Sequence, residues 1–489
     1  MSHNLKSLPH LALKPRGLIF RNVNLARRHH STKQRFHGAA IPSSLSSIQQ
    51  PLKVSSMARL PTKLLLRSLI LTSLMSSKLF LKPALAILHV VTNSKSAILD
   101  PDRNRILNKL LRWTVYNHFC AGTNQNEVAK TVAEIKKIGY QGVILGYSKE
   151  IVVDPNEKLA HDESGSTTYS DKCYEIVEEW KKGTLQTLRM VGAGDYLAVK
   201  YVSNFPISQL TLKVINKQFR LTGAGPISID AMADKKPMPD VLARAMDEIC
   251  IATREQGSRL WLDAEQQILQ HGLDNWAIDI MRKHNRSPTP LVYNTIQGYL
   301  KGSKANLDRH LTLAAQEGFS AGIKLVRGAY IEHETRSLIH DTKEETDASY
   351  DLIADTMLSR RMPEEVNLAF PNAALFLATH NAASAAKAIS KHQELLIANQ
   401  PTILLECGQI QGMADELSCE LVENYERALK TSTANNVSVP KAFKCMAWGS
   451  VAECMQYLHR RAIENKGAVE RTKHMVDALR KELWRRVFG

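Results

Sequence analysis

Two adjacent arginines, Arg460 and Arg461, lie near the end of the chain, and Glu464 follows within one helical turn of both. Two neighbouring guanidinium groups repel each other unless an anion lies beside them, and the planar guanidinium fork matches a carboxylate in a bidentate arrangement. The pair is therefore typical of a clamp for a carboxylate ligand. The alternative is a solvated helix face with one ion pair, which would stabilise the helix by only about 0.5 kcal/mol.

A helix is expected to carry this arginine pair. Ser450, followed three residues later by Glu453, forms a capping box, which predicts that the helix begins at Val451. Gly467 is expected to end it. Apolar residues at helical spacing predict that one face is buried, and these are Val451, Met455, Leu458 and Ala462.

Eight short apolar runs, each followed by a helical pattern, recur from about residue 140 onward. Continuous apolar strands that alternate with helices predict a parallel sheet covered on both faces, and eight such units predict a closed (β/α)8 barrel. A doubly wound open sheet is less well supported, because no strand is followed by G-x-G-x-x-G. The predicted strands are Val143–Tyr147, Tyr196–Lys200, Arg259–Asp263, Leu291–Thr295, Gly322–Val326, Ala374–Ala378, Ile403–Glu406 and Ala442–Cys445.

Polar side chains gather at the predicted carboxyl ends of these strands, where the active site of such a barrel lies. They are Lys200, Asp263 with Glu265, Gln297, Lys324, Arg327 with Tyr330, His380 with Asn381, and Glu406 with Gln409. No Ser–His or Cys–His pair marks a nucleophile elbow, and no group of His and carboxylates has metal-ligand spacing, so no metal is expected. A Schiff-base aldolase that uses Lys200 or Lys324 and a site for a large planar cofactor both fit this set.

The charge of the chain is concentrated at its N-terminus. Among 489 residues the formal net charge is +16, yet residues 1–99 contain 15 Lys and Arg and no Asp or Glu. That leaves 49 of the 64 basic residues against all 48 acidic ones in the remainder. A body so close to neutrality argues against nucleic acid as a partner. The seven cysteines form no C-x-x-C pair, which is typical of reduced thiols in a protein that is not secreted.

The acid-free N-terminus divides into two kinds of segment. Residues 1–38 are rich in Arg, Lys, Ser and His, which is typical of a mitochondrial presequence; a disordered basic arm is the alternative. Residues 39–110 are basic and apolar, and within them residues 57–92 predict a helix pair. Pro83 and the polar residues 93–96 are expected to mark the entry to the main domain. Cations interrupt the apolar run before it reaches the roughly 20 residues of a spanning helix, so the pair either packs on the main domain or lies on an anionic membrane surface.

Two segments interrupt the alternation of strands and helices. Residues 154–180 are expected to form an exposed insertion after the first strand, and residues 204–255 a long helical excursion before the third. With both included, the barrel is expected over residues 111–470, followed by a C-terminal helix over residues 471–489.

Six stretches resemble, in order and spacing, the proline dehydrogenase family, and particularly its mitochondrial, fungal-like members: Leu260–Glu265, Tyr293–Lys301, Lys324–Tyr330, Ala378–Asn381, Gly408–Met413 and Tyr457–Asn465. The resemblance implies a distorted TIM-like barrel with N-terminal helical segments and a C-terminal helix over the active site. It also implies FAD and the oxidation of L-proline to Δ1-pyrroline-5-carboxylate by hydride transfer to flavin N5. Electrons would pass to a quinone at the matrix side of the mitochondrial inner membrane, where the protein would be peripheral. Alternatives from other classes are a Schiff-base lyase or aldolase and a non-catalytic membrane-associated scaffold.

The resemblance also assigns roles to individual residues. The expected substrate and catalytic residues are Arg460 and Arg461 as the carboxylate clamp, Glu464 as the acid that positions them, Lys200 and Asp263 beside substrate and flavin, and Tyr330 as a wall of the substrate pocket. The expected FAD contacts are Gln297, Lys324, Val326, Arg327, Gly328, Ala329, Thr379, His380, Asn381 and Gln409.

The chain departs from the family pattern at two of these positions. Lys324 stands where bacterial members have arginine, which keeps a positive charge beside the flavin but loses the guanidinium fork. Cys445 stands where the family usually has a tyrosine that packs on the proline ring. The smaller side chain leaves room for a ring substituent, which favours either relaxed selectivity or a preference for 4-hydroxyproline. The alternative is that Trp448, or another residue, fills the space.

Overall fold

The structure is a computed structural model of the whole chain. It describes residues 55–489, apart from residues 95, 149, 154–159, 162–166, 169–170, 204–218, 332–333, 432–438 and 465–468. The expected presequence, residues 1–38, lies outside the described residues, as do residues 39–54 of the basic apolar region. Residues Val54–Gly489 form one compact unit, which contains the predicted barrel.

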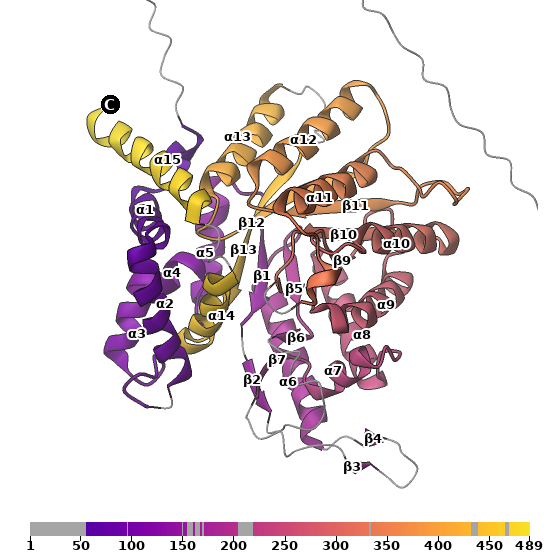
Figure 1. The fold of residues 1–489 in the computed structure, drawn as a ribbon, viewed down its shortest axis with the longest axis horizontal. Coiled ribbons are helices and arrows are strands. Elements are labelled where there is room, and N and C mark those ends of the chain that lie inside the picture. Colours follow the sequence, from indigo (N-terminus) through magenta and orange to yellow (C-terminus); the bar gives the residue numbers. More distant parts are fainter. Residues whose placement is uncertain are drawn as a thin grey trace, which may run out of the picture. The chain divides into compact units, whose positions relative to one another are not determined.

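Eight parallel strands close into a barrel, which confirms the predicted fold (Figure 1). They are β1 (Gly142–Tyr147), β5 (Tyr196–Val199), β8 (Arg259–Leu262), β9 (Val292–Gln297), β10 (Ala321–Val326), β11 (Ala373–Ala378), β12 (Leu404–Ile410) and β13 (Lys441–Trp448). Their order around the barrel is β1-β13-β12-β11-β10-β9-β8-β5. β12 and β13 extend furthest beyond their predicted ends, to Ile410 and Trp448, so Gln409 lies within β12 and Cys445 lies in the middle of β13.

A helix follows each barrel strand, and all of these helices except the last cover the outside of the barrel (Figure 1). These helices are α6 (Asp171–Leu188), α8 (Asp240–Glu255), α9 (Gln267–His284), α10 (Ser303–Glu317), α11 (Lys343–Leu358), α12 (Ala382–Ile397), α13 (Asp415–Thr431) and α14 (Val451–Glu464), while α5 (Gln125–Ile138) precedes β1. Local signals set their ends. Thr342 and Glu345 form a capping box at the start of α11, and Gly139, at a φ of +112°, ends α5 in a conformation that favours glycine.

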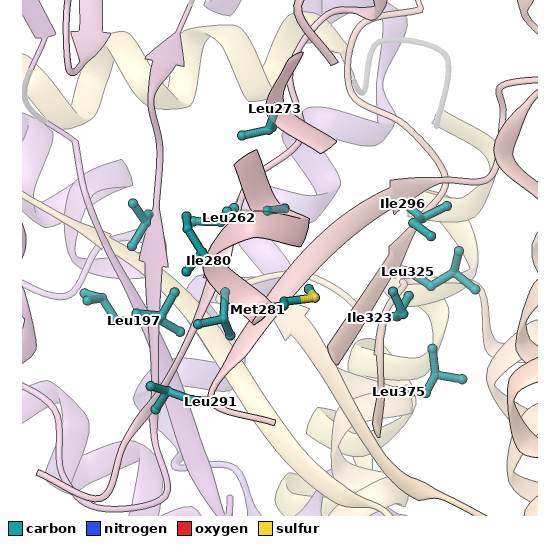
Figure 2. Close-up of a cluster of buried hydrophobic side chains, with 14 of the residues drawn as sticks. Leu197, Leu262, Leu273, Ile280, Met281, Leu291, Ile296, Ile323, Leu325 and Leu375 are labelled. Atoms are coloured by element: carbon teal, nitrogen blue, oxygen red, sulfur yellow. The ribbon is translucent and has the colours of Figure 1, made fainter. Parts of the chain in front are cut away.

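The hydrophobic core lies between the strands and this helical layer. Leu262 of β8 packs outward against the helices, and Leu273 and Met281 of α9 belong to the same cluster (Figure 2). Complete burial of one such side chain stabilises the fold by about 1.5–3 kcal/mol. Because the opposite faces of these strands also fill the barrel interior, their side chains are apolar on both sides, which explains the uninterrupted apolar runs in the sequence.

Aromatic rings fill the barrel interior, and they come from five strands: Tyr196, Trp261, Tyr293, Phe376 and Phe443. Beside them, Arg259 donates two hydrogen bonds to the Glu406 carboxylate, at 2.7 and 2.9 Å, and the Tyr196 hydroxyl donates to the same group. The expectation that Glu406 lies at the active-site end of its strand is therefore wrong. β12 continues past Glu406 to Ile410, and Glu406 pairs with the first residue of β8, at the opposite end of the barrel.

Helices before the barrel pack on the C-terminal helices. They are η1 (Ser56–Arg59), α1 (Thr62–Ser76), α2 (Lys78–Asn93), α3 (Arg105–Leu111), the π-helical turn η2 (Arg112–Tyr116) and α4 (Asn117–Phe119). α1 packs on α15 (Val469–Phe488), and α2 packs on α14. The predicted helix pair is confirmed, but Pro83, expected at the entry to the main domain, lies inside α2. Among the described residues no single helix has the length and apolar content of a membrane span, although α1 and α2, bent by 99°, meet those criteria as a pair.

A buried ion pair anchors α1 to the barrel. Lys444 of β13 donates a hydrogen bond to Asp415 at 2.9 Å, and Ser68 of α1 donates to the same carboxylate at 3.1 Å. Burial by itself would raise the pKa of Asp415, but the nearby Lys444 and His118 hold it below its usual value. Part of the basic apolar region is therefore built into the folded unit.

The two predicted interruptions differ in detail from the expectation. β2 (Glu150–Val153), β6 (Val202–Ser203) and β7 (Phe219–Gly223) form a small antiparallel sheet, and β3 (Ala160–His161) pairs with β4 (Thr167–Thr168). The insertion predicted over 154–180 is too long, because α6 begins at Asp171 and its Trp180 is buried. The excursion over 204–255 contains α7 (Pro226–Ala233) and α8 as predicted, and also β7, which was missed.

Candidate active site

A cavity of about 650 Å³ lies at the carboxyl ends of the barrel strands. It brings together most of the predicted site residues: Lys200, Asp263, Gln297, Lys324, Val326, Arg327, Gly328, Ala329, Tyr330, Thr379, His380, Asn381, Gln409, Cys445 and Arg461. Arg460 is not among its lining residues, and the side chain of Glu464 lies outside the described part of the structure. Residues from seven different strands or their loops therefore meet at one place.

Three charged side chains form the centre of the cavity wall. Lys324 of β10 donates a hydrogen bond to Asp263 Oδ1 at 2.5 Å, and Lys200 Nζ lies 3.8 Å from Asp263 Oδ2. Burial by itself would raise the pKa of Asp263, but Lys324 and Lys200 outweigh it and hold the pKa below its usual value. Asp263 is therefore a carboxylate at neutral pH, and it holds both ammonium groups toward the cavity.

Trp261 and Tyr457 supply aromatic surfaces beside this cluster. The Lys324 ammonium lies 4.3 Å from the centroid of the Trp261 ring, and the Lys200 ammonium lies 5.3 Å from the centroid of the Tyr457 ring. Both distances are within the range of cation–π attraction. Sequence reasoning did not assign either residue, although Trp261 lies two residues before Asp263 and Tyr457 lies one helical turn before Arg461.

Helix α14 presents Arg461 and Tyr457 to the cavity from the same face. The predicted capping box fixes its start, because the backbone N–H of Glu453 donates to Ser450 Oγ at 3.2 Å and the backbone N–H of Ser450 donates to the Glu453 carboxylate at 2.7 Å. Residues four apart in a helix share a face, which places Tyr457 and Arg461 together. The helix ends at Glu464, and its predicted end at Gly467 lies outside the described residues.

Arg327 is held in place by protein groups on three sides. Its guanidinium donates to Asp347, Thr379 and Ser384, each at 2.8 Å, and its central carbon lies 4.4 Å from the centroid of the Tyr350 ring. Burial would raise the pKa of Asp347, but Lys343 and Arg327 together hold it below its usual value. Arg327 is therefore a fixed cation at the wall between β10 and α12.

His380, Asn381 and Gln409 have structural roles as well as lining the cavity. The backbone N–H of Ile410 donates to His380 Nε2 at 3.1 Å, so the neutral ring carries its proton on Nδ1. Asn381 caps α12 by accepting from the backbone N–H groups of Ala383 and Ser384. Gln409 donates to the backbone carbonyl of Thr379 at 3.3 Å. These bonds orient the residues before any ligand binds.

Gln297 and Tyr330 are both bonded to the loop after β8. The Gln297 side chain donates to the backbone carbonyl of Glu265 at 3.0 Å, and the Tyr330 hydroxyl donates to the carbonyl of Ala264 at 3.1 Å. The loop that carries Asp263 is thereby tied to β9 and to the segment after β10. This segment continues into the short 3₁₀ helix η4 (Arg336–Leu338), which lies near the rim of the cavity.

Cys445 lies in β13 between Ile144 of β1 and Ile410 of β12, and it lines the cavity. Burial raises the pKa of its thiol to about 11, so the group is a protonated thiol at neutral pH and not a nucleophile. Trp448 does not fill the space beside it, because its indole N–H donates to Thr187 at 2.9 Å and the residue is not part of the lining. Tyr457, on the facing helix, does line this part of the cavity.

The lining has the charge expected for an anionic ligand. Among its described residues six are Lys or Arg and three are Asp, with no Glu. The cations and carboxylates are Lys200, Lys324, Arg327, Arg336, Lys343, Arg461, Asp263, Asp341 and Asp347. A flavin dinucleotide carries a diphosphate and an amino acid carries a carboxylate, so this donor set and volume fit both. No group of three or more His, Cys, Asp or Glu that could hold a metal ion occurs among the described residues.

Comparison with known proteins identifies the family. The sequence model of the family described as proline dehydrogenase matches residues 128–474. The chain is 26% identical over 416 residues to "Probable proline dehydrogenase, mitochondrial" of Schizosaccharomyces pombe, covering 78% of this chain and 81% of that protein. It is 26% identical over 431 residues to "Hydroxyproline dehydrogenase" of Rattus norvegicus, covering 79% of this chain and 84% of that protein.

The solved structures support the fold. Proline utilization A from Bdellovibrio bacteriovorus, in a form inactivated by N-propargylglycine, matches with a TM-score of 0.56 at 16% identity. The match covers 80% of this chain and 38% of that longer protein. Since the family match extends over most of the barrel and over every stretch that lines the cavity, the chain belongs to the proline dehydrogenase family.

Proposed function

We propose that this protein is an FAD-dependent proline dehydrogenase, which oxidises L-proline to Δ1-pyrroline-5-carboxylate. The observation that carries the proposal is the approach of Arg461 and Tyr457 to Lys324, Asp263 and Lys200 across one cavity. A carboxylate receptor, an aromatic wall and a fixed cation cluster are what a flavin and a cyclic amino acid require of the protein.

FAD, when bound, supplies the hydride acceptor at its N5 atom. Gln297, Lys324, Val326, Arg327, Gly328, Ala329, Thr379, His380, Asn381 and Gln409 would hold it. Lys324 would place a positive charge near the ring system, and Arg327 would meet the cofactor as a cation that Asp347 already orients. Because these polar groups are bonded to the protein beforehand, little reorganisation is needed when the cofactor binds.

The chain itself positions the substrate. Arg461 would bind the carboxylate of proline, with Arg460 and Glu464 supporting it from the same helix, while Tyr330 and Tyr457 would flank the ring. Asp263, ionised and bonded to Lys324, would offset the mutual repulsion of the two lysine ammonium groups and hold both beside the substrate. No protein nucleophile is required, which agrees with the protonated Cys445. Tyr457 and Arg461, which α14 places in the cavity wall, would also limit the access of water to the reacting C5 atom.

The absorbance of the purified protein tests the proposal. We expect flavin bands that L-proline bleaches under anaerobic conditions. Arg461→Ala should retain the bands but require far more proline for bleaching. A colourless protein that stays colourless after incubation with FAD would contradict the proposal, and borohydride trapping of a substrate on Lys200 or Lys324 would favour a Schiff-base lyase instead.

A second candidate is a 4-hydroxyproline dehydrogenase, and Cys445 is the observation that favours it. The thiol lines the cavity and is protonated, so it offers a ring hydroxyl the space that a small side chain leaves and a weak S–H donor. Turnover of L-proline and trans-4-hydroxy-L-proline should be compared for the natural protein and for Cys445→Tyr. The tyrosine should depress turnover of the hydroxylated substrate more strongly, and an unchanged ratio would refute the pocket argument.

The electron acceptor and the location complete the proposal. A quinone of the mitochondrial inner membrane, reached from the matrix side, would reoxidise the flavin, and the mitochondrial relative is consistent with this location. Proline-dependent reduction of a short-chain ubiquinone analogue by the purified protein is the measurement that checks the acceptor. Reduction of the flavin by proline without transfer to the quinone would refute this part alone.

A further inference from the structure

The outer faces of α1, α2 and α3 carry an unusual concentration of exposed apolar side chains. Of the 25 exposed large hydrophobic residues among the described part of the chain, 11 fall within residues 62–113. They are Leu66, Ile70, Leu74, Leu79, Phe80, Ile87, Val90, Ile98, Ile106, Leu110 and Trp113. About a tenth of the chain therefore holds almost half of such residues, which exceeds the scattered apolar exposure of an ordinary protein surface.

These side chains are arranged in stripes along the helices. Leu66, Ile70 and Leu74 follow each other at intervals of four on α1, and Ile106 and Leu110 do so on α3, with Trp113 one turn further in η2. Such spacing aligns side chains on one helix face. Each helix also has a buried or half-buried face that packs on the protein, so the stripes are second apolar faces that folding leaves uncovered.

Positive charge is interleaved with the stripes. Residues 61–119 contain nine Lys and Arg but only two Asp and no Glu. Exposed examples are Lys63, Lys82, Arg103, Arg105 and Lys109. Apolar side chains flanked by cations are typical of helices that lie in the interface of a membrane containing anionic lipids.

We propose that the surface formed by the outer faces of α1, α2, α3 and η2, here named the basic apolar face, binds an anionic lipid bilayer. The helices lie in the interface with their apolar stripes among the acyl chains and their cations among the phosphates. A second copy of this chain is a poorer occupant, because two surfaces of the same strong positive charge repel each other, whereas acidic lipids neutralise them. The proposal deepens the suggested use of a membrane quinone and names the surface that would bring the protein to it.

The basic apolar face is close to the active site. α2 and η2 pack on α14, and Leu88, Leu111 and Val115 contact the cluster that contains Met455 and Leu458 of that helix. The same helix presents Arg461 and Tyr457 to the cavity. In Figure 1, α14 lies between these N-terminal helices and the barrel. A bilayer on this face therefore lies one helix layer away from the substrate clamp.

Sedimentation of the flavin-loaded protein with vesicles tests the proposal. We expect binding to vesicles of equal parts phosphatidylcholine and phosphatidylglycerol, weaker binding to pure phosphatidylcholine, and release by salt. The variant Ile106→Glu/Leu110→Glu/Trp113→Glu should lower the affinity by about tenfold or more, because three apolar anchors are lost and three like charges are added. A control of similar exposure, Leu352→Glu/Ile397→Glu/Leu429→Glu, replaces residues elsewhere that are 49%, 86% and 50% exposed, against 83%, 54% and 71% for Ile106, Leu110 and Trp113, and should bind like the natural protein.

A charge variant and the flavin signal separate the outcomes. Arg105→Glu/Lys109→Glu should weaken binding to the anionic vesicles. This charge variant and the triple apolar variant, here called the α3 variant, should both keep the natural circular dichroism and proline-dependent flavin bleaching. Absence of binding by the natural protein, or equal binding by the α3 variant and its control, would overturn the proposal. A dimer that the α3 variant dissociates would also overturn it, in favour of self-association. Vesicle binding by a protein that proline does not reduce would support the surface and refute only the proposed enzyme activity.

Discussion

Asp263→Asn removes the negative charge on which two lysines of the cavity depend. Lys324 Nζ lies 2.5 Å from Asp263 Oδ1, and Lys200 Nζ lies 3.8 Å from Oδ2. Loss of one partner from a buried ion pair typically costs about 3–5 kcal/mol, since the remaining charge stays buried without compensation. The side chains of Asp263 and Lys324 are 18% and 11% exposed to the cavity, so we expect the lower end, about 3 kcal/mol. For a folded body of this size that corresponds to a fall in Tm of about 3 °C.

Thermal unfolding followed by circular dichroism, with FAD in excess, measures this cost. The matched control is Glu423→Gln, which breaks an ion pair with Arg427 whose side chains are 35% and 59% exposed, and it should cost less than about 0.5 kcal/mol. The double variant Lys324→Met/Asp263→Asn should recover part of the lost stability, because it also removes the Lys324 ammonium group that Asp263→Asn leaves without its carboxylate partner. Equal effects of Asp263→Asn and the control, or no recovery in the double variant, would refute the argument that the pair is electrostatically coupled and buried.

Three further measurements test other parts of the structure. Arg461→Ala should weaken proline binding by about 2–4 kcal/mol in titrations of flavin bleaching, and Arg460→Ala should weaken it less, because only Arg461 lines the cavity. Burial lowers the pKa of His118 to about 4 in the folded protein, so as the pH falls the unfolded chain binds a proton at this residue before the folded protein does. Between pH 7 and pH 5 the natural protein should therefore lose about 2 kcal/mol more stability than His118→Gln. Denaturant unfolding at both pH values measures this difference. Ser450→Ala removes the cap of α14 and should lower stability by about 1 kcal/mol in the same assay, whereas Ser450→Asp should not.

The helix and strand assignments followed from signals that are local in the sequence. The capping box at Ser450 and the apolar strands depend on residues a few positions apart, so they could be recognised without tertiary contacts. β7 was missed because its longer partner, β2, lies far earlier in the chain and its nearer partner, β6, has only two residues, so nothing local distinguishes Phe219–Gly223 from a loop. Pro83 lies inside α2 and not at the entry to the main domain, because the packing of a helix decides whether it accommodates an internal proline.

The residue types of the site could be predicted from the sequence alone. Residues at the carboxyl ends of barrel strands meet at one end of the barrel, and the spacing of the family motifs indicates which residues these are. Which of these charged side chains pair with each other could not be predicted from the sequence. Whether Asp263 binds Lys324 or Lys200, and whether Glu406 belongs to the site or to the opposite end of the barrel, depends on strand length and register, which a shift of one residue would reverse. The same holds for the second apolar faces of α1, α2 and α3. The sequence shows that these helices are apolar and basic, but only the packing on α14 and α15 decides which faces are left uncovered.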